Sequence, residues 1–467
     1  MSTAARDEGR ASAPTPRPLP SAPRSYHFPR FERATLANGL RLFVAAVPKL
    51  PLVSISAVID AGATAELEGD EGVATLTAQL LLEGAAGRDG AALADRFERI
   101  GTSVEAGADW DSATVSLTVL AERQRDALSL VRDMLRAPAF PEREVARLRD
   151  ERLAELLQRR AEPGALADDQ FARAVYATGA RYAVPAAGST ESVRGLTPAT
   201  VRRFYEKHYQ PATTTLVLAG DVTMVRAHAL ADELFGDWSG APARADHRAV
   251  DTAARGSLVR VVAKPDAPQS ELRVGHVGLP RRHPDYFAAT VMNAVLGGLF
   301  SSRINLNLRE EHGYTYGAFS AFEWRRDAGP FAIHTAVRSD VTTAAVQEIL
   351  REIDGMRSAP IDEAELTLAT SYLDGVFPIR YETTAAIATA LSNLVIHDLP
   401  EDFYDEYRGR IRSVTRQDVL RAAQQHLHPD QLRIVAAGDP QVIAGPLAEI
   451  NGATVEIVRP DASEGTA

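Results

Sequence analysis

The chain has 467 residues and a formal net charge of −11, from 62 acidic and 51 basic side chains. This length is too great for one hydrophobic core and predicts two or three domains. The negative balance, without long runs of one sign, argues against a nucleic-acid-binding or anionic-membrane surface. The sequence contains no cysteine. Disulfides, thiolate zinc sites, iron–sulfur clusters and cysteine nucleophiles are therefore excluded.

The start of the chain is rich in Ala, Pro and Arg and has no apolar stretch typical of a signal peptide. We therefore expect residues 1–30 to form a flexible arm and the protein to be cytoplasmic, with a periplasmic location left open. No stretch approaches eighteen apolar residues. A membrane span is not expected, because a spanning helix needs about that many.

Apolar and β-branched runs in the first third of the chain predict strands at residues 41–43, 52–59 and 113–120. Helical patterns lie between and after these runs. This order predicts an α+β fold, in which helices cover one face of a mostly antiparallel sheet.

The sequence repeats itself when it is shifted by 218 positions, which aligns residues 193–221 with residues 411–439. Composition alone would give roughly two identities over such a stretch. Each copy predicts an N-capping threonine, an amphipathic helix, a break marked by proline and a short apolar strand that ends in Gly-Asp. The identical pairs are Arg194/Arg412, Thr197/Thr415, Val201/Val419, Arg203/Arg421, His208/His426, Pro211/Pro429, Val217/Val435, Ala219/Ala437, Gly220/Gly438 and Asp221/Asp439.

The repeat extends upstream, where residues 74–84 (ATLTAQLLLEG) are similar to residues 289–298 (ATVMNAVLGG). Both segments predict an apolar helix closed by a glycine in the left-handed conformation. The repeating unit is therefore a whole domain of about 210 residues. We expect two homologous domains at 31–238 and 257–458, a linker rich in Ala, Gly and Arg at 239–256, and a tail at 459–467.

Residues 60–87 (DAGATAELEGDEGVATLTAQLLLEGAAG) resemble the central segment of the pitrilysin/insulinase family of zinc metallopeptidases. In that family a turn of small residues leads into a helix with the inverted zinc motif H-x-x-E-H. Two imidazoles one helical turn apart hold the zinc there, and the glutamate takes a proton from the zinc-bound water. The motif positions here are Thr75, Ala78 and Gln79, which can do neither, so the resemblance implies a degenerate motif with no metal.

The resemblance places the third zinc ligand of the family at Glu155. A lone carboxylate cannot hold zinc, and its surroundings (LRDERLAELLQRR) are typical of a solvated helix face. The histidines nearest to a cluster in sequence are His208, His426 and His428. They precede the prolines of the repeat, and we expect them to be structural.

The second half keeps the other part of the family's active site. Residues 297–322 (GGLFSSRINLNLREEHGYTYGAFSAF) resemble its C-terminal signature, in which an arginine at a helix end and a tyrosine seven residues later complete the catalytic centre. The matching residues are Arg309 and Tyr316. Arg303 is expected to be structural, and Tyr314 is the alternative tyrosine if the register slips.

The spacing of this pair also makes physical sense without the resemblance. Arg309 is expected near a helix C-terminus, Gly313 can turn the chain, and Tyr316 is expected on the strand that follows. Both side chains could then point into one cleft. A phenol can donate to an oxyanion, and a guanidinium can hold a carbonyl or carboxylate. The opposing interpretation is a solvated arginine and a half-buried strand tyrosine with no function.

The resemblance spans nearly all of residues 30–458 and implies a subunit without zinc. The chain resembles the arginine- and tyrosine-bearing partner of bacterial two-subunit peptidases and the non-catalytic subunit of mitochondrial processing peptidase. We expect this chain to be inactive alone and to complement a homologous partner that carries zinc, around a peptide substrate. The alternatives are a non-catalytic structural or peptide-binding scaffold of the same fold, or a peptidase with a rebuilt metal site. The lack of a histidine pair at helical spacing argues against the last.

Overall fold

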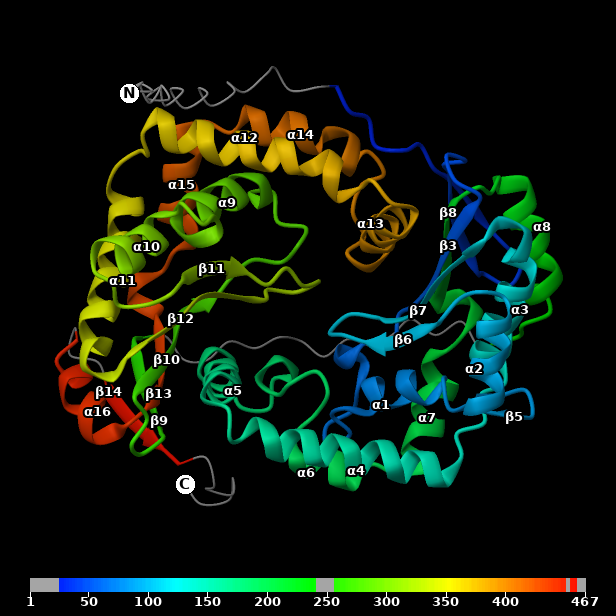
Figure 1. The fold of residues 1–467 in the computed structure, drawn as a ribbon, viewed down its shortest axis with the longest axis horizontal. Coiled ribbons are helices and arrows are strands. Elements are labelled where there is room, and N and C mark those ends of the chain that lie inside the picture. Colours follow the sequence, from blue (N-terminus) through cyan, green and yellow to red (C-terminus); the bar gives the residue numbers. More distant parts are fainter. Residues whose placement is uncertain (1–24, 241–255, 451–453, 460–467) are drawn as a thin grey trace, which may run out of the picture.

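The structure is a computed structural model that describes residues 25–240, 256–450 and 454–459. The chain forms two halves, each built around one six-stranded sheet (Figure 1). Most of the expected arm, linker and tail falls outside the described residues. The α+β fold predicted from the sequence, with two halves of mostly antiparallel sheet and covering helices, is confirmed.

The first sheet has the strand order β1-β2-β8-β3-β7-β6. Its predicted strands at 52–59 and 113–120 are confirmed, and the strand predicted at 41–43 continues to residue 46. Only β2 and β8 run parallel within this sheet. Its strands are β1 (Glu32–Thr35), β2 (Arg41–Ala46), β3 (Leu52–Ile59), β6 (Glu105–Ala108), β7 (Ala113–Leu120) and β8 (Thr214–Gly220).

The second sheet repeats this arrangement in the order β14-β9-β13-β10-β12-β11. Five positions match in order and direction, with β9 and β13 as the parallel pair that corresponds to β2 and β8. The outer strand differs, because β14 is parallel to its neighbour whereas β1 is antiparallel. The strands are β9 (Leu258–Ala263), β10 (Gln269–Val277), β11 (Ala318–Phe322), β12 (Pro330–Arg338), β13 (Arg433–Gly438) and β14 (Thr454–Val458).

The repeated segment folds as predicted in both copies. Helices α7 (Pro198–His208) and α15 (Arg416–His426) each begin after a threonine whose hydroxyl accepts a hydrogen bond from the third helical N–H. A short 3₁₀ turn at the proline then leads into β8 or β13, and every residue of these two strands is buried.

The predicted glycine caps of the upstream helices are wrong. Helix α1 (Val73–Leu80) ends before Gly84, which lies in the short strand β4 (Gly84–Ala85) with φ 138°. A Cβ at Gly84 would approach the Arg88 carbonyl oxygen to 2.6 Å, so close backbone contact is the reason for glycine there. In the second half, α9 (Tyr286–Asn293) continues as a π-helical turn to Gly298.

The remaining helices complete the layers. They are α2 (Gly90–Arg99), α3 (Gln124–Arg136), α4 (Glu142–Arg159), α5 (Pro163–Val175), α6 (Thr190–Gly195), α8 (Met224–Phe235), α10 (Arg303–Asn305), α11 (Thr342–Ser358), α12 (Glu363–Arg380), α13 (Thr384–Ile396), α14 (Phe403–Ser413) and α16 (Pro440–Ala448). Helices α3 and α8 pack together beside the first sheet, and α11, α15 and α9 form the main layer of the second half (Figure 1).

Each half contributes one helix to the sheet of the other. Helix α5 of the first half packs on β13, β10 and β9, whereas α13 of the second half packs on β3 and β8. Both helices lie toward the middle of the molecule (Figure 1). The contacts are apolar with polar additions, such as the 2.8 Å hydrogen bond between the hydroxyls of Ser54 and Thr384. The apolar inner faces of the sheets are thus covered reciprocally.

The loop between β11 and β12 adds a second junction between the halves. The Arg325 guanidinium lies 4.0 Å from the Trp110 ring and 4.5 Å from the Tyr182 ring, both in the first half. Arg326 Nη1 donates to Asp60 Oδ1 at 2.9 Å, and its Nη2 donates to the Ile396 carbonyl at 3.1 Å.

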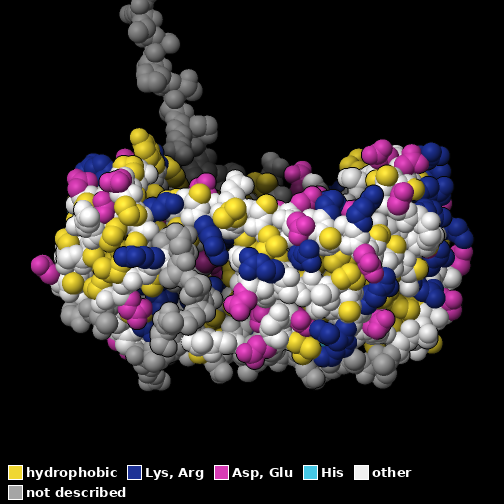
Figure 2. Space-filling view, turned by 90° about the horizontal axis from the view of Figure 1, so that it is seen from below, with side chains coloured by type: hydrophobic (Ala, Val, Ile, Leu, Met, Phe, Trp, Pro, Cys, Tyr) yellow, Lys and Arg dark blue, Asp and Glu magenta, His cyan; other side chains and the backbone are white. Residues whose placement is uncertain are grey.

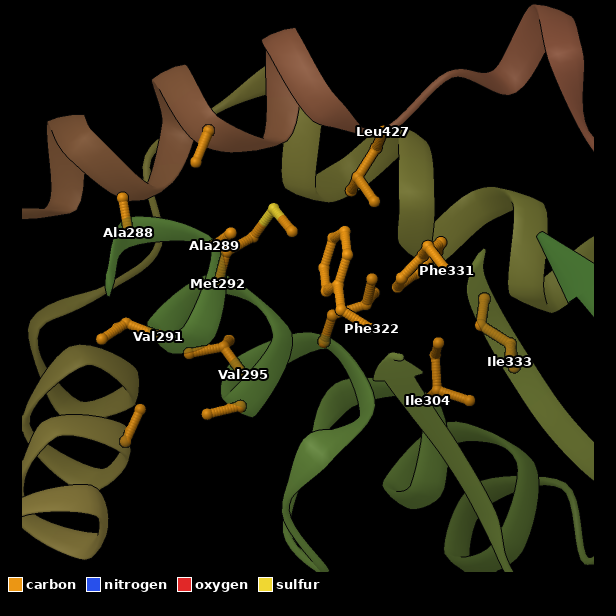
Figure 3. Close-up of a cluster of buried hydrophobic side chains, with 14 of the residues drawn as sticks. Ala288, Ala289, Val291, Met292, Val295, Ile304, Phe322, Phe331, Ile333 and Leu427 are labelled. Atoms are coloured by element: carbon orange, nitrogen blue, oxygen red, sulfur yellow. The ribbon is translucent and has the colours of Figure 1, made fainter. Parts of the chain in front are cut away.

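The core of the second half surrounds α9, whose side chains face Phe322, Phe331 and Leu427 (Figure 3). The segment from Tyr286 to Glu311 is long and apolar enough to span a membrane by length and composition, but 61 % of its most apolar window is buried inside the protein. Leu299 also interrupts the helix with extended backbone. This segment is therefore a core element of the fold.

Part of the expected arm is packed against the second half. Phe28 is 5 % exposed, and its ring stacks on Tyr404 with centroids 4.7 Å apart. The Tyr26 hydroxyl donates to the Tyr381 carbonyl at 3.3 Å. Residues 25–30 therefore bind the body of the protein as an extended segment.

The buried His276 on β10 makes stability depend on pH. Its Nδ1 lies 2.7 Å from the Val277 carbonyl oxygen and donates to it, and its Nε2 accepts from the His428 N–H at 3.2 Å. Burial lowers the pKa of His276 from 6.5 to about 4. The unfolded chain therefore binds a proton between pH 6.5 and 4 that the folded chain does not, so stability falls as the pH falls through this range.

We predict that His276→Gln makes this loss of stability shallower. Glutamine offers both a donor and an acceptor but does not titrate, and His276 accounts for up to about 3 kcal/mol between pH 6.5 and 4. Urea unfolding from pH 7 to pH 4 measures the effect. Parallel curves for the variant and the wild type would show that His276 does not titrate on unfolding.

Candidate active site and substrate-binding surface

The degenerate zinc motif lies on α1, which contains no histidine, cysteine or acidic residue. Thr75 is half-buried, Ala78 is buried and Gln79 is exposed. The helix packs on α7 and α4 as a core element. These three side chains do not fit a zinc ion, because none of them is a ligand that zinc takes in proteins.

Glu155, the remaining family ligand position, lies on the exposed side of α4. Its carboxylate pairs with Arg152 at 3.0 Å, and 63 % of its side chain is exposed. The face of the molecule that carries α4 shows acidic and basic side chains interspersed (Figure 2). Glu155 therefore belongs to a solvated, ion-paired helix face.

A buried ion pair holds the start of α1 in place. Glu66 Oε1 accepts hydrogen bonds from the N–H groups of Gly72 and Ala74 at 3.0 and 2.9 Å, and Oε2 accepts from Arg181 Nε at 2.7 Å. Both charged side chains are fully buried. Burial raises the pKa of Glu66, and the Arg181 guanidinium and the two N–H donors oppose this rise. The motif helix keeps its anchor although it has no metal ligands.

We predict that Glu66→Ala destabilises the first half by about 3–5 kcal/mol, because it leaves the Arg181 guanidinium buried without its counter-ion. The exposed Glu68 nearby provides the matched control, and Glu68→Ala should change stability little. Thermal unfolding of both variants measures the difference. Equal melting temperatures would contradict a structural role for the buried pair.

Arg309 lies in the π-helical turn Leu306–Glu311, close to its C-terminal end. Its guanidinium is 4.6 Å from the centre of the Phe300 ring and 3.5 Å from a Glu310 carboxylate oxygen. Gly313 then turns the chain with φ 63°, as expected. Phe300 is 71 % exposed, so Arg309 is placed on an accessible aromatic surface.

Tyr316 is not on a strand, and that prediction is wrong. It lies in a bend two residues before β11, and it is 96 % exposed. The strand begins later because the chain first forms a tight loop, in which Thr315 Oγ1 bonds both the N–H and the carbonyl of Gly317. A bend leaves the phenol free of the sheet, so an outside group can reach it.

The two other residues of the signature have structural contacts. Arg303 forms a two-point ion pair with Glu365, at 2.5 and 2.7 Å, as its expected structural role requires. Tyr314 packs against the core of the second half, and its ring lies 5.0 Å from the His312 ring. Of the two tyrosines, Tyr316 is the accessible one.

The three histidines expected to be structural, His208, His426 and His428, each contact a different partner. His208 is buried against Phe204, and the His428 ring lies 5.1 Å from the His276 ring. His426 Nε2 bonds Asp285 Oδ2 at 2.7 Å.

Sequence reasoning missed an aromatic surface on the edge strand β11. Phe319 is 54 % exposed, and its ring stacks on His334 of β12 with centroids 4.8 Å apart. Burial lowers the pKa of His334 to about 4, so the imidazole is neutral at pH 7. The outward position of Phe319 in the alternating pattern AFSAF was the available signal. With Phe300 and Tyr316, it gives this part of the second half three exposed aromatic rings.

Two hollows lie along the seam between the halves, and neither is lined by Arg309 or Tyr316. The smaller, of about 360 Å³, holds three arginines and two aspartates, namely Arg41, Arg282, Arg326, Asp60 and Asp398. His397 also lines this hollow, and burial lowers its pKa to about 4, so this side chain is neutral at pH 7. The hollow is therefore a polar part of the interface between the two halves.

A duplicated α+β fold, a motif helix without metal ligands, a half-buried Arg309 and an exposed Tyr316 together define a metallopeptidase-like chain. The model of the insulinase family (peptidase family M16) matches residues 43–184, and the model of the peptidase M16 inactive domain matches residues 195–373. The chain belongs to the pitrilysin/insulinase family of peptidases, M16.

Comparison with individual proteins supports this family assignment. An uncharacterized zinc protease of Streptomyces coelicolor is 26 % identical over 403 residues, which cover 85 % of this chain and 87 % of that protein. The crystal structure of a peptidase M16 inactive domain from Pseudomonas fluorescens superposes with a TM-score of 0.82 at 27 % identity, covering 88 % of this chain and 98 % of that one. A protease from Helicobacter pylori, at 18 % identity and a TM-score of 0.82, shares the fold over 88 % of this chain and 99 % of its own.

Proposed function

We propose that the chain is the non-zinc subunit of a heteromeric peptidase and completes the active site of a homologous partner that carries zinc. The observation that carries this proposal is the contrast between α1 and the second half. Helix α1 has no ligand for zinc, whereas Arg309 and Tyr316 both keep the family's residue types at its spacing. Tyr316 is 96 % exposed, so a group outside this chain can reach it.

In the proposed assembly the partner supplies the zinc and the glutamate that activates water. The Tyr316 hydroxyl donates a hydrogen bond to the oxyanion that develops on the scissile carbonyl. The Arg309 guanidinium binds a carbonyl or carboxylate of the peptide with its planar pair of N–H donors. The contact of Arg309 with the Phe300 ring orients this guanidinium without enclosing it.

Two sheet edges could bind an extended peptide by strand addition. Strand β6 (Glu105–Ala108) ends the first sheet and β11 (Ala318–Phe322) ends the second. A peptide that pairs with such an edge is held through its main chain, which gives a loose sequence preference. Exposed Phe319 on β11 would favour apolar substrate side chains nearby.

We predict that a mixture of this chain and its zinc-bearing homologue cleaves a quenched unstructured peptide, and that this chain alone does not. Tyr316→Phe should lower kcat of the mixture by about 10²-fold, because it removes one oxyanion donor. Arg309→Lys should raise KM, because lysine cannot form the two-point contact.

Tyr372→Phe is the matched control, since Tyr372 is an exposed tyrosine on α12, outside the signature. It should leave the rate unchanged. If the mixture is no faster than the homologue alone, this chain is a structural or peptide-binding scaffold. If the chain alone cleaves the peptide and a chelator stops it, the chain holds its own catalytic metal.

A further inference from the structure

A cluster of two histidines and one aspartate joins the start of α9 to the end of α15. We call it the His–Asp–His cluster, and it consists of His283, Asp285 and His426. His283 and Asp285 lie in the turn before α9, and His426, 141 residues from Asp285, is the last residue of α15. One possible ligand atom from each side chain lies within 4.8 Å of the other two.

The contacts within the cluster are hydrogen bonds: the His426 Nε2–H donates to the Asp285 carboxylate, so a bound ion must displace this proton, and His283 Nδ1 is an acceptor. His426 Nε2 is 2.7 Å from Asp285 Oδ2, and His283 Nδ1 accepts a hydrogen bond from the Asp285 N–H at 3.1 Å. An accepting Nδ1 carries no proton. The two imidazole rings lie with their centroids 5.0 Å apart and their planes at 81° to each other.

We propose that the His–Asp–His cluster binds a divalent transition-metal ion of the zinc class. Two imidazole nitrogens and one carboxylate oxygen are a set that zinc and its neighbours take in proteins, with water in the remaining position. The ion replaces the direct hydrogen bond between Asp285 and His426. All three side chains are partly buried, which limits competition from bulk water without blocking access.

Arg421 supplies the outer contact of this site. Its Nη1 donates to Asp285 Oδ1 at 2.8 Å, which fixes the carboxylate with Oδ2 turned to His426. Such a contact orients a metal ligand. The positive charge of Arg421 also repels a cation, so we expect weaker binding than in a closed four-ligand structural site.

This cluster is distinct from the degenerate motif on α1, which lies in the other half. In the sequence repeat His208 corresponds to His426, but His208 is buried against Phe204. The turn before α1, which corresponds to the turn before α9, is held by Glu66 instead of a histidine and an aspartate. The cluster therefore belongs to the second half only. Bound metal would link α9 to α15 as a structural element, and zinc in the purified chain would not by itself indicate peptidase activity.

The test is titration of the full chain, stripped of metal with a chelator, with zinc chloride in a calorimeter. We expect one equivalent to bind, and His283→Ala and His426→Ala each to weaken binding at least tenfold. Asp285→Asn keeps the size of the side chain and its place at the helix start, and it should weaken binding as well. His228→Ala is the control, because His228 is an exposed histidine on α8 away from the cluster.

A melting-temperature rise with zinc in the wild type, absent in the cluster variants, would be the second readout, because a ligand that binds only the folded state stabilises it. Cobalt(II) absorption gives a third, since its visible bands report nitrogen and oxygen ligands directly. The proposal fails if no zinc binds, or if a folded cluster variant binds zinc as the wild type does. Neither result bears on the peptidase proposal, which concerns Arg309 and Tyr316.

Discussion

The exchange of one helix between the halves is the contact on which the rest of the structure depends. Helix α5 covers the second sheet and α13 covers the first, so each half would expose an apolar sheet face without the other. Polar contacts between the halves add to the exchange, including the pair of Arg273 with Asp168 of α5 at 2.5 Å and, at the loop between β11 and β12, the Arg326–Asp60 pair at 2.9 Å. An interface that buries so much apolar surface resists relative motion of the halves. Closure around a substrate is therefore expected between subunits.

The rigid contact between the halves explains how α1 can lack zinc ligands and still keep its position in the fold. Helix α1 is held by the buried Glu66–Arg181 pair and by apolar packing, neither of which involves a metal. The side chains at the motif positions could change without loss of the fold. Tyr316 shows the reverse pattern, because it is almost fully exposed and contributes little to packing. Retention of such a residue is better accounted for by a role outside this chain than by stability.

The sequence predicted well those elements whose signals are local. Strands β3 and β7 are runs of apolar and β-branched residues, so residues 52–59 and 113–120 could be read directly. The repeat revealed α7 with β8 and α15 with β13, because capping threonines and Gly-Asp ends recur in both. The degenerate motif and the arginine–tyrosine pair came from resemblance.

The features that the sequence did not reveal depend on long-range contacts. An amphipathic helix shows that it has an apolar face, but it does not show that α5 and α13 cover the sheet of the opposite half. Tyr316 was assigned to a strand because its neighbours alternate, whereas Thr315 and Gly317 form a tight loop before β11. His426 meets Asp285 only after α15 packs on α9, so no spacing within the chain could have indicated their cluster.

The most direct measurement is the position of Tyr316 relative to the partner's metal. Fluorotyrosine would be incorporated into this chain, and the ¹⁹F resonance of Tyr316 would be assigned by its loss in Tyr316→Phe. The zinc-bearing homologue would be loaded with paramagnetic cobalt(II), freed of excess metal and added with an inert peptide. Our account predicts that the Tyr316 resonance shifts and broadens while that of Tyr372 does not. An unchanged Tyr316 resonance in a complex that forms would contradict a shared active site.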